Sequence, residues 1–276
     1  TLALVMEALQ SYLPARVPSR EDWLIDTLGA AVGATGAVVL ARLGAIDRWS
    51  QIRGRWFVPH SRGGIVLLAL WPPSLLFPAA VPFGLGQVLE RVEAALAEHL
   101  VDTPFLNWLP LRETELQPLV LGAEMGCVWL RLLIPCLLGF CLVRARLRRV
   151  AFVLMTVGVG VGVSALSAAL SWGPAHAWAW LGLPAQLGMV MAVLLALVLA
   201  FVPWRASAAL LLVSLGVYLS LLNQAPESAY FAQTLQAWEQ GRFIRLHGLA
   251  QWLGWLWPYA ALVYGLSLMG AGGPKN

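Results

Sequence analysis

Ionisable residues are concentrated near the start of the chain, between two apolar segments. Glu7 and Gln10 are three residues apart, so on a helix they share one face. Arg16 follows in a short stretch bounded by prolines, and Asp22 and Asp26 open the next apolar run. An ionisable side chain inside a membrane is costly unless it is paired or hydrated, and such side chains commonly mark functional sites. The spacing therefore predicts a polar site in which Glu7 contacts Arg16, with Gln10 and Asp22 close by.

The two acidic residues that open the second apolar run differ in their surroundings. Ser19 and Asp22 have the spacing of a capping box, and capping is a sufficient structural reason for Asp22. Asp26 lies one helical turn deeper, in line with Gly29 and Gly33. The Gly-x-x-x-Gly spacing predicts close approach of a neighbouring helix, which would hold Asp26 against the groups that this helix presents.

The composition indicates which elements must position these residues. Hydrophobic residues make up 59% of the 276-residue chain and charged residues 12%, and the mean hydropathy is +0.74. A helix that spans a bilayer needs about 20 mostly apolar residues. The sequence therefore predicts an all-α, polytopic transmembrane helical bundle with about seven complete spans and a partial N-terminal helix at 1–13. The predicted spans lie near 24–44, 63–82, 118–143, 149–171, 184–203, 206–222 and 247–269.

The distribution of arginine predicts how these spans are oriented. Basic clusters at 42–62, at 144–149 and at Arg205 lie an odd number of crossings from the loop at 14–23. Because cytoplasmic loops collect Lys and Arg, these clusters and the C-terminus are predicted to be cytoplasmic. Prolines near the end of the 63–82 run predict a kinked or broken crossing there. The loops predicted to lie outside are 14–23, 83–117, 172–183 and 223–246.

Residues for soluble-enzyme or metal chemistry form no pattern in the sequence. The three cysteines fall in one predicted span, and the four histidines are scattered along the chain. Metal-binding, phosphate-binding and nucleophile motifs are absent, so the sequence predicts no cofactor and no metal site and leaves enzymatic activity open. The net charge of +4 is spread over short loops, which favours anionic lipid as its partner and gives no support to nucleic-acid binding.

Several further features have structural interpretations. Segments near 85–100 and 228–240 are amphipathic and are predicted to lie on the outer membrane surface. The glycines at 158–162 predict close helix packing. Glu124 and Arg131 lie seven residues apart in one predicted span, where the long arginine side chain predicts a structural ion pair.

A possible contact for an anionic head group lies near the start of the last predicted span. The basic residues there are Arg242, Arg245 and His247, beside a tryptophan-rich stretch. Tryptophan is enriched at membrane–water interfaces, so anchoring of the helix end is the simpler interpretation of this stretch.

The N-terminal motif resembles that of the VanZ-like membrane proteins, named for a factor of resistance to the glycopeptide antibiotic teicoplanin. The motif of that family is a helix ending in Glu-x-x-Gln, a short loop with Arg, and a next helix opened by Asp-x-x-x-Asn-x-x-Gly. The matching residues here are Glu7, Gln10, Arg16, Asp22, Asp26 and Gly29, with Asp26 where the family usually has Asn. The resemblance covers 1–45 and implies the C-terminal part of a VanZ-like domain whose earlier helices precede residue 1. It makes 46–276 an additional membrane region, as in longer members.

Three functions are compatible with these features. The resemblance implies an integral membrane protein of the bacterial cell envelope, in the cytoplasmic (inner) membrane, that binds or modifies a lipid-linked or cell-wall component in relation to glycopeptide resistance. Intramembrane ionisable residues alternatively fit a proton-coupled small-molecule transporter. A structural membrane subunit without catalysis is the third. Membrane lipids are expected partners in all three cases.

The predicted orientation can be tested with single cysteines and a membrane-impermeant maleimide. We expect a cysteine at Gly173 to react in intact cells, because 172–183 is predicted to be an outer loop. A cysteine at Gln51 should react only after the cells are opened. The reverse pattern of labelling would contradict the orientation.

Overall fold

The computed structural model describes residues 20–59, 61–76, 83–101, 103–105, 119–225 and 244–270. In this part of the chain all regular elements are helices, and an isolated bridge pairs Phe57 with Val143. The chain divides into two compact units, Thr1–Arg55 and Trp56–Asn276. The all-helical fold predicted from the composition is confirmed for the described residues.

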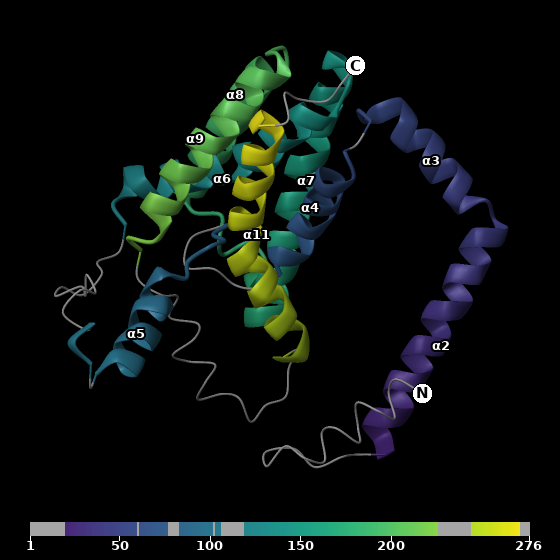
Figure 1. Ribbon diagram of the computed structural model, residues 1–276, viewed down its shortest axis with the longest axis horizontal. Helices are drawn as coiled ribbons and strands as arrows, with labels where there is room; N and C mark the ends of the chain where they lie inside the picture. Colours follow the sequence, from purple (N-terminus) through teal and green to yellow (C-terminus); the bar gives the residue numbers. More distant parts are fainter. Residues whose placement is uncertain are drawn as a thin grey trace. The chain divides into compact units, whose positions relative to one another are not determined.

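The first unit contains two helices in its described part. They are α2 (Arg20–Arg42) and α3 (Ala45–Trp56) (Figure 1). Their axes differ by 69°, and the turn between them passes through Gly44 with φ +69°, a conformation that glycine adopts without strain.

Three of the five arginines of the basic cluster at 42–62 lie in α3, at Arg48, Arg53 and Arg55. Asp47 lies in the first turn of that helix, and Arg53 and Arg55 lie in its last turn. Acidic residues at a helix N-terminus and basic residues at its C-terminus are both favoured by the helix dipole. The central part of the basic cluster therefore lies on a polar helix.

The second unit is a bundle built around α6. Its elements are α4 (Arg62–Ser74), α5 (Leu89–Leu100), α6 (Leu121–Leu142), α7 (Arg146–Trp172), the short 3-10 helix η2 (Pro174–His176), α8 (Leu183–Leu199), α9 (Trp204–Leu222) and α11 (Ile244–Gly270). Helix α6 packs mainly against α8 and α9, and also against α7 and α4, while α11 packs against α4 and α9 (Figure 1). From Leu130 to Leu142 every residue of α6 is buried, so this helix forms the core.

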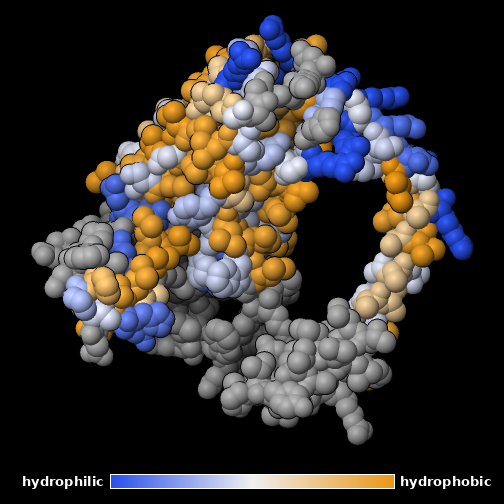
Figure 2. All heavy atoms as spheres, viewed as in Figure 1, coloured by the Kyte–Doolittle hydropathy of each residue, from blue (hydrophilic) through white to orange (hydrophobic). Residues whose placement is uncertain are grey.

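Helix α8 shows how small and large residues divide between the interior and the surface. The residues it buries are Ala185, Gly188, Ala192 and Ala196. Those it exposes include Val190, Leu194 and Val198, which follow one another at the spacing of a helical stripe. Hydrophobic side chains gather along this flank of the bundle (Figure 2). Small residues toward the neighbouring helix and large apolar ones outward are the arrangement expected in lipid.

Glycine permits close packing at particular positions only. A Cβ at Gly188 would lie 2.8 Å from the carbonyl oxygen of Met125, and one at Gly160 would lie 2.9 Å from the Trp71 ring. A Cβ at Gly158 or Gly162 would meet no atom of the described residues within 4 Å. The close packing predicted for 158–162 is therefore confined to Gly160.

The spacing Gly29-x-x-x-Gly33 predicted close approach of a neighbouring helix to α2. A Cβ at either glycine would meet nothing within 4 Å in the part of the chain that the structure describes. Both positions lie on α2 among exposed large apolar residues such as Leu28 and Val32, and close packing at this spacing stays a prediction.

Three described helices are long and apolar enough to cross a membrane, and a fourth span results if the bent pair Thr27–Arg42 and Ala45–Trp56 counts as one. The three are α6, α7 and α9. The protein is thus a helical membrane protein, with fewer candidate spans in its described part than the seven predicted. The physical reasons are local: α4 has 13 residues and α8 has 17, and α11 contains several tryptophans and Pro258. Residues 77–82 of the predicted second span lie outside the described part.

The amphipathic segment predicted near 85–100 is confirmed as a helix, α5, which exposes Val92 and Leu96. Its position on a membrane surface stays a prediction. The segment at 228–240 lies outside the described residues.

Replacement of Gly188 by alanine tests the contact between α6 and α8. A glycine-to-alanine change inside a helix stabilises it by about 0.5 to 1 kcal/mol when space is available. We expect that gain for Gly162→Ala, whose added methyl group meets nothing. We expect Gly188→Ala to lose about 1 to 3 kcal/mol, because the methyl group would press on backbone of α6 that cannot rotate away. The free energy of unfolding in mixed micelles measures both, and equal effects would contradict the packing.

Candidate functional site

The side chains predicted to form an N-terminal polar site lie outside the described part of the chain. Glu7, Gln10 and Arg16 lie outside the described residues. Asp22 and Asp26 fall within α2, and their side chains are also outside the description. The same holds for the predicted head-group contacts: Arg242 precedes α11, and Arg245 and His247 lie in its first turn without described side chains. Both groupings stay predictions.

The described residues contain a different polar centre, at Arg131. This residue lies near the middle of the 22-residue helix α6 and is 0% exposed. It is the largest of the fully buried side chains, among leucines and other apolar residues. A charged side chain at the centre of a membrane helix is expensive and marks a functional site by default.

Aromatic rings from two other helices surround the guanidinium. The Arg131 Nη1 donates a hydrogen bond to the Tyr218 hydroxyl of α9 over 3.2 Å. Its central carbon lies 5.2 Å from the centre of the Tyr218 ring and 5.4 Å from that of Trp257 in α11. Such cation–π contacts contribute about 2 kcal/mol each when desolvated, whereas the loss of hydration costs several kcal/mol. The aromatic rings therefore reduce the penalty of burial without neutralising the charge.

Among the described residues, two of the three guanidinium nitrogens have no hydrogen-bond partner. Nε and Nη2 of Arg131 are buried and make no hydrogen bond with the described residues. These two nitrogens carry parallel N–H groups on one edge of the guanidinium plane. That edge is the fork that binds a carboxylate or a phosphate through two hydrogen bonds. The free groups are thus the pair best suited to an oxyanion.

The predicted ion pair between Glu124 and Arg131 is wrong. Seven residues correspond to a rise of about 10 Å along a helix, and no salt bridge joins these two described side chains, because Arg131 turns to Tyr218 instead. Glu124 lies in the first turn of α6, where the helix dipole favours a carboxylate. From Met125 to Ala225 the chain contains six arginines and no acidic residue. This stretch thus supplies no carboxylate that could pair with Arg131.

An irregular loop at 83–88 is hydrogen-bonded to the polar centre. The Tyr218 hydroxyl accepts a hydrogen bond from the Leu85 N–H over 2.6 Å and donates one to the Leu85 carbonyl oxygen over 2.8 Å. Non-helical backbone at membrane depth is tolerated only where protein groups satisfy it. Tyr218 meets this requirement, and it joins the loop to Arg131.

Asn223 and Tyr259 hold the remainder of this loop. The Asn223 Oδ1 accepts from the backbone N–H groups of Val88 and Leu89, each over 3.2 Å, and so caps the start of α5. The Asn223 Nδ2 and the Tyr259 hydroxyl both donate to the Gly86 carbonyl oxygen, over 3.3 Å and 3.1 Å. Gly86 has φ +92°, and a Cβ there would lie 2.7 Å from Leu219, so only glycine fits.

Sequence reasoning identified Arg131 but missed Tyr218, Asn223 and Leu85. Leu85 and Tyr218 are 133 residues apart, and no spacing rule connects them. The signal that could have been used is the absence of acidic residues between Met125 and Ala225, which leaves Arg131 without any carboxylate in the surrounding sequence.

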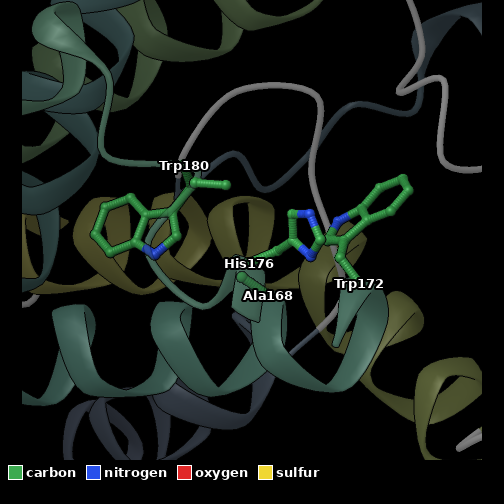
Figure 3. Close-up of a pocket in the computed structure, with 5 residues that line it drawn as sticks. Ala168, Trp172, His176 and Trp180 are labelled. Carbon is green, nitrogen blue, oxygen red and sulfur yellow. The ribbon is translucent and has the colours of Figure 1, made fainter. Parts of the chain in front are cut away.

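A separate pocket of about 440 Å³ lies beside the end of α7. It is lined by Ala168, Trp172, His176, Ala179 and Trp180, and Figure 3 shows His176 between the two indole rings. The Trp180 Nε1 donates to the Ala177 carbonyl oxygen over 3.0 Å, so this indole is fixed by its own turn. A lone imidazole among aromatic and small residues offers no partner for acid–base chemistry, and the pocket fits an interfacial aromatic cluster.

The described residues contain no group of side chains suited to metal or thiol chemistry. No three His, Cys, Asp or Glu side chains of this part of the chain lie together as metal ligands. Cys127, Cys136 and Cys141 are buried free thiols of α6. Comparisons of the chain with family models, with curated proteins and with solved structures find no match.

Replacement of Tyr218 by phenylalanine tests the central hydrogen bonds. The change keeps the ring and leaves the N–H and carbonyl groups of Leu85 buried without partners, so we expect a loss of about 2 to 4 kcal/mol in the free energy of unfolding. Tyr259→Phe is the matched control: it removes the bond to the Gly86 carbonyl oxygen at a partly exposed position, and we expect a loss of about 1 kcal/mol. Reversible unfolding in mixed micelles measures both. A smaller loss for Tyr218→Phe than for Tyr259→Phe would contradict the proposed centre.

Proposed function

We propose that this chain is a VanZ-like membrane protein of the bacterial cell envelope that binds a lipid-linked or cell-wall component through an anionic group. In this proposal it lies in the cytoplasmic membrane with seven spans and a cytoplasmic C-terminus. The N-terminal motif with Glu7, Gln10, Arg16 and Asp22 supports the family assignment. The relation to glycopeptide resistance rests on that motif alone.

The observation that carries the binding function is the free fork of Arg131. A guanidinium stays charged at any physiological pH, so burial cannot be relieved by loss of a proton. Its Nε and Nη2 make no hydrogen bond with the described residues, and the neighbouring sequence supplies no carboxylate. An anion that supplies two oxygens would satisfy both nitrogens and cancel the charge. The site therefore favours a ligand with a phosphate or carboxylate group.

The surroundings of Arg131 favour an amphiphilic ligand that carries this phosphate or carboxylate group. The neighbours of its guanidinium are Tyr218, Trp257 and the apolar residues of α6, which are compatible with a hydrocarbon chain. A lipid-linked phosphate has both required parts, an anionic group and an apolar chain. The predicted contacts Arg242, Arg245 and His247 would form a second, interfacial contact for the same class of ligand.

A transporter is the second candidate, and one observation favours it. Arg131 lies near the middle of α6, fully enclosed, next to non-helical backbone at 83–88. Transporters place substrate sites near the middle of the membrane, next to interrupted helices. A transport assay in liposomes distinguishes the two functions, because a transporter moves its anion across the membrane and a binding protein does not.

Replacement of Arg131 by methionine tests the binding proposal. Binding of a polyprenyl phosphate to the purified protein is measured by titration, with the uncharged polyprenol as the comparison ligand. We expect Arg131→Met to weaken binding of the phosphate at least about tenfold, because charged hydrogen bonds contribute about 1.5 to 3 kcal/mol each. Binding of the polyprenol should not change. Arg205→Gln, which removes an exposed arginine of α9, is the matched control and should bind like the original protein.

The free energy of unfolding of the same variants shows whether Arg131 serves to bind a ligand or to stabilise the fold. Removal of an unpaired buried charge should leave the free energy of unfolding unchanged or raise it by about 1 to 4 kcal/mol. A structural role predicts the opposite, a marked loss of stability with unchanged binding of the phosphate. That combination would contradict the proposed function.

A further inference from the structure

A second site lies at one end of the bundle, where three candidate spans terminate. Helix α6 ends at Leu142, α7 begins at Arg146 and α9 begins at Trp204. Because all three are long and apolar enough to cross a membrane, this end lies at a membrane–water interface. A pocket of about 470 Å³ opens there, and its lining includes Arg144, Arg146, Arg149 and Trp204.

Arg149 is fixed in the wall of this pocket by backbone oxygens. Its Nε donates to the Val143 carbonyl over 3.1 Å, and its Nη1 donates to those of Ala200 and Val202 over 3.3 Å and 2.7 Å. The residue is 8% exposed. Its third nitrogen, Nη2, makes no hydrogen bond with the described residues and is not enclosed as the free nitrogens of Arg131 are. A rigidly held guanidinium therefore keeps donors available to a ligand in the pocket.

Within the part of the chain that the structure describes, the other two arginines add positive charge without an ion-pair partner. Arg144 and Arg146 are exposed, and neither makes an ion pair among the described residues. Arg146 is close enough to Arg149 for their like charges to interact. The nearest acidic residues in sequence lie before Met125 and after Ala225. The pocket thus carries three positive charges and no compensating carboxylate from its own segments.

Two helix N-termini increase this positive potential. The N-cap residues Ala145 of α7 and Pro203 of α9 make no side-chain cap hydrogen bond, and both line or border the pocket. The first helical bonds run from Arg149 to Ala145 and from Ser207 to Pro203, so the N–H groups of the first three residues of each helix lack helical partners. Unpaired N–H groups and the helix dipole both favour a bound anion.

We propose that this pocket binds the phosphate group of an anionic membrane lipid. The arginines and the two helix ends bind the phosphate, and Trp204 lies at the level of the head groups, where indole rings are favoured. The position at the end of three candidate spans places the phosphate within reach while the acyl chains stay in the bilayer. This site is distinct from the centre at Arg131 and does not depend on the function proposed for it.

The test uses the two exposed arginines, because Arg149 also holds the turn between α8 and α9. Binding is measured from the shift in the thermal unfolding midpoint of the full chain in a neutral detergent. The probes are phosphatidylglycerol, phosphatidylcholine and inorganic phosphate. We expect phosphatidylglycerol alone to raise the midpoint at micromolar concentrations. The double variant Arg144→Gln/Arg146→Gln should weaken this effect at least about tenfold and leave the midpoint without lipid unchanged.

Arg205→Gln is the matched control, because Arg205 follows Trp204 and stacks on its ring without lining the pocket. It should respond to phosphatidylglycerol like the original protein. An unchanged response of the double variant would overturn the proposal, as would an equal response to phosphatidylcholine. A response to inorganic phosphate as strong as that to phosphatidylglycerol would overturn the assignment to a lipid.

Discussion

The hydroxyl of Tyr218 is the group on which the centre of the bundle depends. It accepts hydrogen bonds from Arg131 and from the Leu85 N–H, and it donates to the Leu85 carbonyl oxygen. One side chain of α9 thereby provides hydrogen-bond partners for the irregular loop at 83–88 and for one guanidinium nitrogen of Arg131 in α6. Neither could be buried at this depth without a polar partner, since an unpaired backbone group or charge in an apolar interior costs several kcal/mol.

The arginine centre and the glycine contacts have opposite effects on the free energy of folding. Small residues of α8 lie directly against α6, with Gly188 facing the carbonyl of Met125, and this packing stabilises the bundle. Arg131, in contrast, retains two buried nitrogens that make no hydrogen bond within the described part of the chain. A core that packs closely can tolerate such a residue. This combination is typical of sites at which stability is lowered in exchange for binding.

The amino-acid sequence predicts the helical class and the charged residue at the centre, but it does not predict the centre's partners. Runs of apolar residues suffice to locate α6, α7 and α9, because length and composition decide whether a helix can cross a bilayer. The pairing of Glu124 with Arg131 failed because helix geometry separates residues seven positions apart, whereas tertiary packing brings Tyr218 to Arg131. Prolines explain why the span predicted at 63–82 is helical in its described part only to Ser74. The N-terminal cluster stays a prediction.

The loop at 83–88 has a consequence for the exchange of its amide protons with solvent. Amides in irregular loops usually exchange rapidly, because they are not protected by a regular hydrogen-bonded structure. Here the N–H groups of Leu85, Val88 and Leu89 are bound by side chains of α9 and its C-cap residue. Exchange at Leu85 requires its hydrogen bond to Tyr218 to break, and a movement of Tyr218 also breaks the bond to Arg131. Exchange at Val88 and Leu89 requires their bonds to Asn223 to break. Deuterium uptake at the Leu85 amide therefore reports how often the arginine centre opens, whereas uptake at Val88 and Leu89 reports how often Asn223 is released.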